Sequence, residues 1–106
     1  MDRELQSILS ELRVALEGLY GSRLSHLVLF GSQARGTAVA GSDIDVLVVL
    51  NGSFRVGEEI RRVGKVTAAI SLRHNVVISS TFASTSRFLG EQSPLLINVR
   101  REGIPV

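Results

Sequence analysis

Two short polar stretches decide the fold of this chain: GSQARG at residues 31–36 and SDID at residues 42–45. Each adjoins an apolar run, because Leu27–Phe30 precedes the first stretch and Ile44–Leu50 begins inside the second. Apolar runs of this length, bounded by glycine and polar residues, predict buried strands. The sequence therefore places a glycine-containing turn at the end of one strand and two aspartates at the start of the next.

The two aspartates, Asp43 and Asp45, are expected to act together. Residues i and i+2 of a strand point to the same face, so both carboxylates project on one side while Ile44 turns into the core. Two adjacent carboxylates repel and raise each other's pKa unless a cation lies between them. A hard divalent cation such as Mg²⁺, or Mn²⁺ in its place, would take these oxygens together with those of a phosphate.

The glycine-containing stretch is suited to binding phosphate. Gly31 allows a positive φ or a close approach of the backbone to a ligand. Ser32 offers a hydroxyl and a backbone N–H where a helical turn starts, and Arg35 on the same turn can reach a phosphate. Gly36 and Ser42, which close the first stretch and open the second, complete the candidate nucleotide-binding set.

The rest of the chain predicts helices packed on a small central sheet, an α/β fold in a single domain over residues 1–106. A leading helix of about 17 residues carries leucines on one face. A second helix includes Ile60, Val63, Thr67 and Ile70, Val76–Ile78 is a third strand, and a last helix starts at Ser93-Pro94. Residues 81–92 are ambiguous.

Composition excludes several classes of protein. Twelve basic against ten acidic residues leave a formal charge of only +2 in 106 residues, too little for a protein that coats nucleic acid. The chain has no cysteine and no apolar run of about 20 residues, so we expect a cytoplasmic protein without a membrane span. Walker and dinucleotide-binding glycine motifs are absent.

Residues 31–36 and 42–45 together resemble the G-S-x-A-R-G…S-D-I-D signature of the DNA polymerase beta-like nucleotidyltransferase superfamily, and of its minimal nucleotidyltransferases in particular. The resemblance implies a nucleotidyltransferase fold with a mixed sheet and transfer of a nucleoside monophosphate, AMP from ATP, to an acceptor hydroxyl. It also implies a HEPN-type partner protein, to which the chain would be the antitoxin, within a homo- or hetero-oligomer. Nucleic acid is not the expected direct ligand.

One part of the superfamily pattern is missing. Members usually carry a third carboxylate on the strand beside the Asp-x-Asp strand, whereas residues 74–80 contain neither Asp nor Glu. Asn75 occupies the corresponding position in our alignment, and an amide cannot accept a proton at physiological pH. Glu58 and Glu59 lie among charged neighbours on the second predicted helix and are expected to be solvated.

Two functions therefore remain open. The first is a metal-dependent nucleotidyltransferase, favoured by the intact Gly-Ser and Asp-x-Asp stretches. The second is a catalytically impaired nucleotide-binding module that regulates a partner by docking, favoured by the missing carboxylate. An RNA-binding basic domain would rest on net charge alone.

Overall fold

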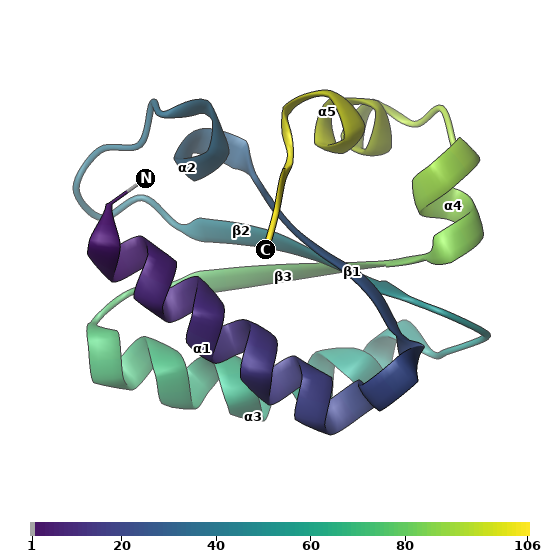
Figure 1. Cartoon of the computed structure of the whole chain (residues 1–106), viewed down its shortest axis with the longest axis horizontal. Coiled ribbons are helices and arrows are strands. Elements are labelled where there is room, and N and C mark those ends of the chain that lie inside the picture. The colour runs from purple at the N-terminus through teal and green to yellow at the C-terminus, as the bar shows by residue number, and fades with distance from the viewer. Residues whose placement is uncertain (1) are drawn as a thin grey trace.

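The computed structural model describes residues 2–106 and contains a four-stranded mixed sheet (Figure 1). The strands are β1 (Leu24–Phe30), β2 (Ile44–Leu50), β3 (Ile78–Ser84) and β4 (Ile104–Pro105), in the order β3-β2-β1-β4. Strand β1 runs antiparallel to both β2 and β4, and β3 runs parallel to β2. The α/β class and the mixed sheet predicted from the sequence are confirmed.

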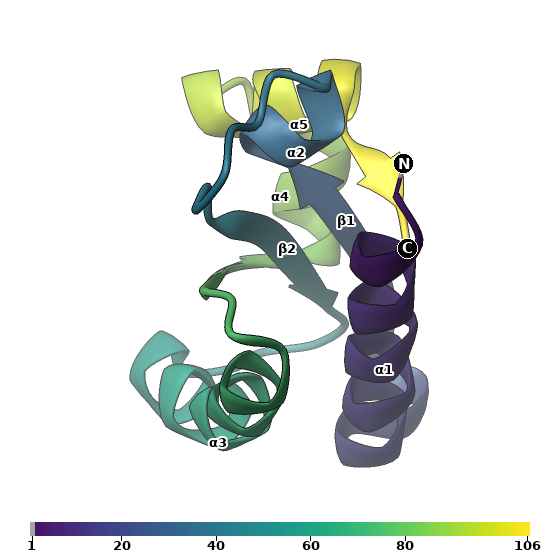
Figure 2. The same cartoon turned by 90° about the vertical axis from the view of Figure 1, so that its left-hand side faces the viewer.

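Helices cover both faces of this sheet (Figures 1 and 2). One face carries α1 (Arg3–Tyr20) and α3 (Val56–His74), and α1 leads into a 3-10 turn at Gly21–Arg23. The other face carries three shorter helices: α2 (Gly31–Arg35), α4 (Thr85–Gly90) and α5 (Pro94–Glu102). Within residues 2–106, no helix combines the length and the apolar character needed to cross a membrane.

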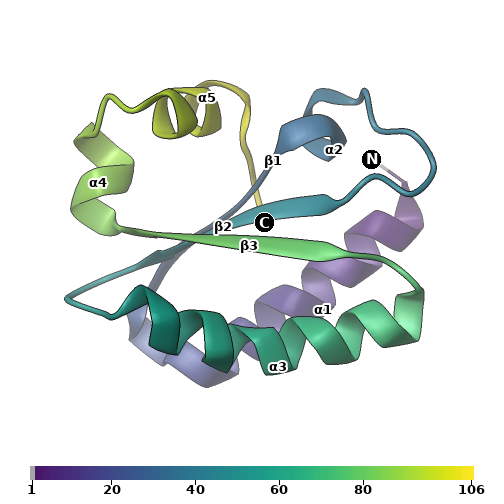
Figure 3. The ribbon, with the colours of Figure 1, turned by 180° about the vertical axis from the view of Figure 1, so that it is seen from behind.

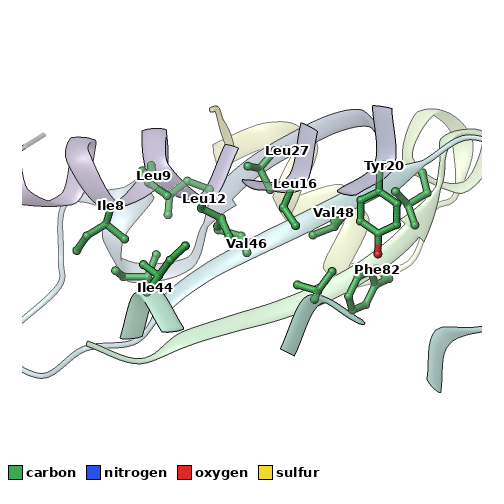
Figure 4. Close-up of a cluster of buried hydrophobic side chains, with 14 of the residues drawn as sticks. Ile8, Leu9, Leu12, Leu16, Tyr20, Leu27, Ile44, Val46, Val48 and Phe82 are labelled. Carbon is green, nitrogen blue, oxygen red and sulfur yellow. The ribbon is translucent and has the colours of Figure 1, made fainter. Parts of the chain in front are cut away.

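The core follows the alternation of β2. Ile44, Val46 and Val48 point toward α1 and α3, where they meet side chains such as Leu12 and Phe82 (Figure 4). Leu47 and Val49 point to the opposite face, where they pack with Val28, Ala83, Leu96 and Val99. The strand is apolar along its length because both of its faces are buried.

The predicted third strand was misplaced. Helix α3 continues to His74, and Asn75 ends it in a left-handed conformation with φ 53°. Strand β3 therefore starts at Ile78 and ends at Ser84, so the ambiguous residues 81–92 supply its second half and α4. The two-residue β4 was not foreseen, because it forms only by pairing with Val28 and Leu29 of β1.

A buried polar contact joins the two long helices. Glu59, expected to be solvated, is only 2% exposed and accepts a hydrogen bond of 2.7 Å from the hydroxyl of Tyr20. Arg62 also donates to Glu59, at 3.1 Å. Burial, and then the bond to Glu59, raises the pKa of Tyr20. The helical pattern placed Glu59 beside charged residues but could not reveal that α1 brings a phenol over it.

We expect Tyr20→Phe to lower the free energy of unfolding by about 1.5–3 kcal/mol, since it removes a hydrogen bond to a charged, buried group. Urea denaturation measures this loss. The matched control is Glu17→Gln, which breaks the exposed Arg13–Glu17 ion pair and should cost less than about 1 kcal/mol. Equal losses in the two variants would contradict a stabilising role for the buried contact.

Candidate functional site

The two diagnostic stretches meet at one end of the sheet, where β1 ends and β2 begins (Figure 1). Because the two strands are antiparallel, Phe30 pairs with Asp45, and the turn that follows Phe30 starts beside the aspartates. Helix α2 contains the Gly-Ser pair, and it packs on β1, β2 and α5. The structure thus brings Gly31 beside Asp45, with Ser32 next along α2 and Asp43 close enough for its charge to act on Asp45.

Gly31 and Asp45 are in direct contact. Gly31 has φ +73°, a conformation that side chains other than glycine rarely adopt. A Cβ atom on this residue would fall on Oδ2 of Asp45 and lie 3.2 Å from its Cγ. The glycine is therefore required twice, once for its backbone angle and once for the space that the carboxylate occupies.

The environment of Asp45 disfavours the ionised form of its carboxyl group. Partial burial raises its pKa above the ordinary 3.8, the charge of Asp43 raises it further, and Arg35 lowers it. A raised pKa means that the ionised form destabilises the native state. This penalty is absent below pH 3.8 and complete above the raised pKa, so the cation-free protein carries it at neutral pH. A bound cation between the carboxylates would remove it.

Arg35 lies at the mouth of the site. Its guanidinium forms an ion pair of 3.4 Å with Glu102 at the end of α5, and about half of its side chain is exposed. Gly36 ends α2 in a left-handed conformation, which allows the chain to leave toward residue 37. Glu102 therefore orients Arg35, and no local pattern predicted this pairing because the two residues are 67 positions apart in the chain.

Ser42 forms hydrogen bonds that fix the loop before the two aspartates. Its hydroxyl accepts a hydrogen bond from the backbone N–H of Val39 at 3.0 Å, and its own N–H donates to the carbonyl of Val39. The amide of Gln33 on α2 reaches the carbonyl of Ser42 at 3.5 Å. Ser42 thus sets the loop before Asp43, and Gln33 is a second contributor that sequence reasoning missed.

Asn75 does not lie beside the carboxylates. It ends α3 and lines a cavity of about 510 Å³ together with the start of α1, Gln33 and Ser42, and neither Asp43 nor Asp45 lines that cavity. The register of the parallel pair sets Ser79 opposite Asp45 instead. Ser79 is exposed and lies on the Asp45 face, where the superfamily resemblance would put a third carboxylate.

The donor set fits a hard divalent cation held in part by a ligand. In the part of the chain that the structure describes, no cluster of three or more His, Cys, Asp or Glu side chains could enclose a metal. Asp45 at the start of β2, with the charge of Asp43 acting on it, matches the way Mg²⁺ is usually held, by one or two carboxylates with water and substrate phosphates.

Comparison with known proteins assigns the chain to a family. Residues 4–86 match the family described as "Nucleotidyltransferase domain". The chain belongs to this nucleotidyltransferase family. The match includes α1 to β3 and both diagnostic stretches of the site, whereas α5 and β4 lie outside it.

Two similar proteins come from Methanocaldococcus jannaschii. "Putative protein adenylyltransferase MJ0141" is 29% identical over 76 residues, which cover 72% of this chain and 76% of that protein. "Putative protein adenylyltransferase MJ1305" is 44% identical over 48 residues, which cover 45% of this chain and 33% of the longer protein. The chain thus matches only a third of the length of one of these curated relatives.

A solved structure described as a toxin-antitoxin with AMP-PNP has the same fold. It superposes with a TM-score of 0.62 at 19% identity, covering 89% of this chain and 68% of the solved one. At this level of identity the likeness concerns the fold alone.

We expect Gly31→Ala to destabilise the protein by more than about 1–2 kcal/mol, the usual cost of a left-handed residue that gains a Cβ. The excess comes from the collision with the Asp45 carboxylate. The control is Gly52→Ala, which has a similar φ of +80° but open space around its Cβ, so that its loss reports the backbone term alone. Denaturant unfolding of both variants measures the difference, and equal losses would contradict the close contact.

Proposed function

We propose that this protein is a metal-dependent nucleotidyltransferase that transfers AMP from ATP to a hydroxyl group of a protein. The observation that carries the proposal is the contact between Gly31 and Asp45, because it joins the phosphate-binding turn to the Asp-x-Asp strand in one site. Family membership supports the reaction class. The names of the two relatives support adenylyl transfer to protein.

In this proposal Asp43 and Asp45 hold Mg²⁺ or Mn²⁺, while the turn at Gly31 and Ser32 binds the phosphates of ATP. When bound, the cation neutralises the negative charge that develops on the reacting phosphate. Arg35 exchanges part of its contact with Glu102 for a phosphate oxygen, which a half-exposed guanidinium can do with little rearrangement. The acceptor hydroxyl attacks the α-phosphorus and pyrophosphate leaves.

The acceptor side is less complete than the nucleotide side. Ser79 stands where a carboxylate would accept the proton of the attacking hydroxyl, and a serine is a poor base at neutral pH. The proton therefore passes to solvent water, and we expect turnover to be slow while ATP affinity is ordinary. A positioned base contributes about 10²–10⁴-fold to a rate.

We also propose that the protein acts as the antitoxin of a pair with a HEPN-type partner. The resemblance of residues 31–45 to minimal nucleotidyltransferases supplies this expectation. The solved toxin-antitoxin structure has the same fold as this chain, which makes a protein partner the first one to test.

The alternative is a catalytically impaired module that binds ATP and regulates its partner by docking. Ser79 at the third position is the specific observation in its favour. The two functions differ in one measurable respect, since only the enzyme leaves a covalent nucleotide on the acceptor.

We expect the double variant Asp43→Asn and Asp45→Asn to lose Mg²⁺-dependent ATP binding by at least about tenfold, because neutral amides no longer attract the cation. Isothermal titration calorimetry of ATP with and without Mg²⁺ measures the loss. In wild type, Mg²⁺ with ATP should also raise the melting temperature, and this shift should vanish in the double variant.

The matched control is Asp2→Asn, which makes the same change at the third aspartate of the chain. Asp2 caps α1 through a bond from the N–H of Leu5, and asparagine caps a helix equally well, so ATP binding should persist. Unchanged affinity in the double variant would overturn the metal-site assignment.

We expect Ser79→Asp to increase the rate of AMP transfer, by up to about 10²-fold, because it restores a base beside Asp45. Transfer of labelled AMP from ATP to the partner protein measures the rate, and ATP affinity should change little. Asn75→Asp is the matched control, since it adds the same charge at the end of α3 and should leave the rate unaltered.

The pair of variants also separates the two functions. A faster Ser79→Asp variant supports an enzyme that lacks only its base. A wild type that transfers at about 1 s⁻¹ or faster would exclude the impaired-module alternative. A larger effect of Asn75→Asp than of Ser79→Asp would contradict the assignment of the third position.

A further inference from the structure

Strand β3 forms an unprotected edge of the sheet. Among residues 2–106 it pairs only with β2, in an unbroken register from Ile78 to Ser84, and none of its seven residues is charged or a proline. Figure 3 looks onto this edge, and no helix of the described chain crosses in front of β3. Natural edge strands are usually blunted by charges, prolines or bulges, since unpaired backbone groups invite another strand. Because β3 has none of these protecting features, its open edge can pair with a further strand.

The backbone groups on this edge can be identified. The N–H of Ile44 donates to the carbonyl of Val77 at 2.8 Å. In a parallel ladder alternate residues face the partner strand, so the odd-numbered residues of β3 bond to β2. The N–H and C=O groups of Ile78, Ser80 and Phe82 therefore point to the open side. In addition, the Ser80 hydroxyl is buried and has no hydrogen-bond partner in residues 2–106.

A line of uncharged residues also runs along the flank of α3 below this edge. Helix α1 packs against the flank of α3 that contains Val66, Ala69 and Arg73. At about 100° per residue, Gly64 lies on the opposite flank of α3, together with Ile60 and Ser71. Ile60 is 55% exposed, and a Cβ built on Gly64 would meet nothing within 4 Å. The open edge thus continues into a neutral strip of small and apolar residues.

We propose that this edge binds a second copy of the chain, with the two β3 strands antiparallel about a two-fold axis at Ser80. The pairing extends the sheet to eight strands and sets the two α3 helices side by side. About a two-fold axis the same surface patch of each copy contacts its counterpart. A charged strip would therefore repel the same strip of the second copy, whereas a neutral strip can pack against it.

The register follows from the side chains. With the axis at Ser80, the two Ser80 residues are direct cross-strand neighbours. The Ser80 hydroxyl, which is covered by its own chain and has no partner in residues 2–106, can then turn about χ1 and bond to its counterpart in the second copy. Ile78 then lies opposite Phe82 of the second copy, and Ser79 lies opposite Thr81 of the second copy. Apolar pairs and hydroxyl pairs of these kinds stabilise neighbouring strands. An axis at Thr81 would instead set Ser80 against Phe82.

The first experiment uses sedimentation equilibrium of the full chain over a wide range of concentration. We expect wild type to dimerise and Gly64→Lys to weaken the dimer by at least about tenfold, because it brings two like charges together near the axis. The open space at Gly64, and the better helix propensity of lysine, leave the monomer folded. Gly18→Lys is the matched control: it also replaces an unobstructed helical glycine, but on α1, and should not alter dimerisation.

The second experiment tests the register with disulfides in a chain that has no cysteine of its own. Ser79→Cys and Thr81→Cys proteins are oxidised separately and as a mixture. A pair of this type has its Cα atoms about 4.5 Å apart, within reach of a disulfide. We expect a cross-linked dimer only in the mixture.

Three results would overturn the proposal. A wild type that stays monomeric at the highest concentration excludes the dimer. If the Gly64→Lys variant dimerises as strongly as wild type, the dimer interface lies on another surface. Thr81→Cys protein that links to itself, without its mixed partner, places the axis at Thr81 and contradicts the proposed register.

Discussion

The burial of β2 on both faces is the constraint on which the rest of this structure depends. Residues Val46–Leu50 have no exposed surface, so each face of the strand requires its own cover. Helices α1 and α3 supply one cover and α5 supplies the other. Polar residues are then confined to the two ends of β2, and the two aspartates take the end that adjoins the turn after β1. The position of the site is therefore a consequence of how the core is closed.

The electrostatics of the candidate site lower the stability of the fold. Asp45 is held against the backbone of Gly31, partly out of water and beside a second carboxylate. Each of these features raises the pKa of Asp45 and destabilises the cation-free protein at neutral pH. Arg35, oriented by Glu102, offsets part of that repulsion. The same arrangement favours a cation and phosphate, because a ligand that neutralises the carboxylates relieves the strain.

The open edge of β3 and the proposed active site are neighbours. Ser79 lies both on the edge strand and opposite Asp45, so the strand that would carry the missing carboxylate is also the strand that would pair with a second copy. Antiparallel pairing would bring the end of the second β3, and the helix α4 that follows it, toward the Asp43 and Asp45 end of the first copy. Association and acceptor binding would then share one surface.

The sequence by itself determined the local structure of the candidate site. The stretches at residues 31–36 and 42–45 predicted a turn and a strand with two carboxylates, because glycine, alternation and local charge act over a few residues. The apolar run of β2 likewise predicted a strand buried on both faces. These features need only near neighbours in the chain, and the structure reproduces them.

Only the tertiary structure decided the rest. Whether Asn75 or Ser79 lies beside Asp45 depends on where α3 stops, and a left-handed turn at Asn75 shifts β3 by several residues. The pairing of Arg35 with Glu102 joins residues far apart in the chain, as does the burial of Glu59 under Tyr20. Local sequence patterns cannot specify such contacts. The contacts arise from packing between helices and strands, and a local pattern does not show which of these become neighbours in space.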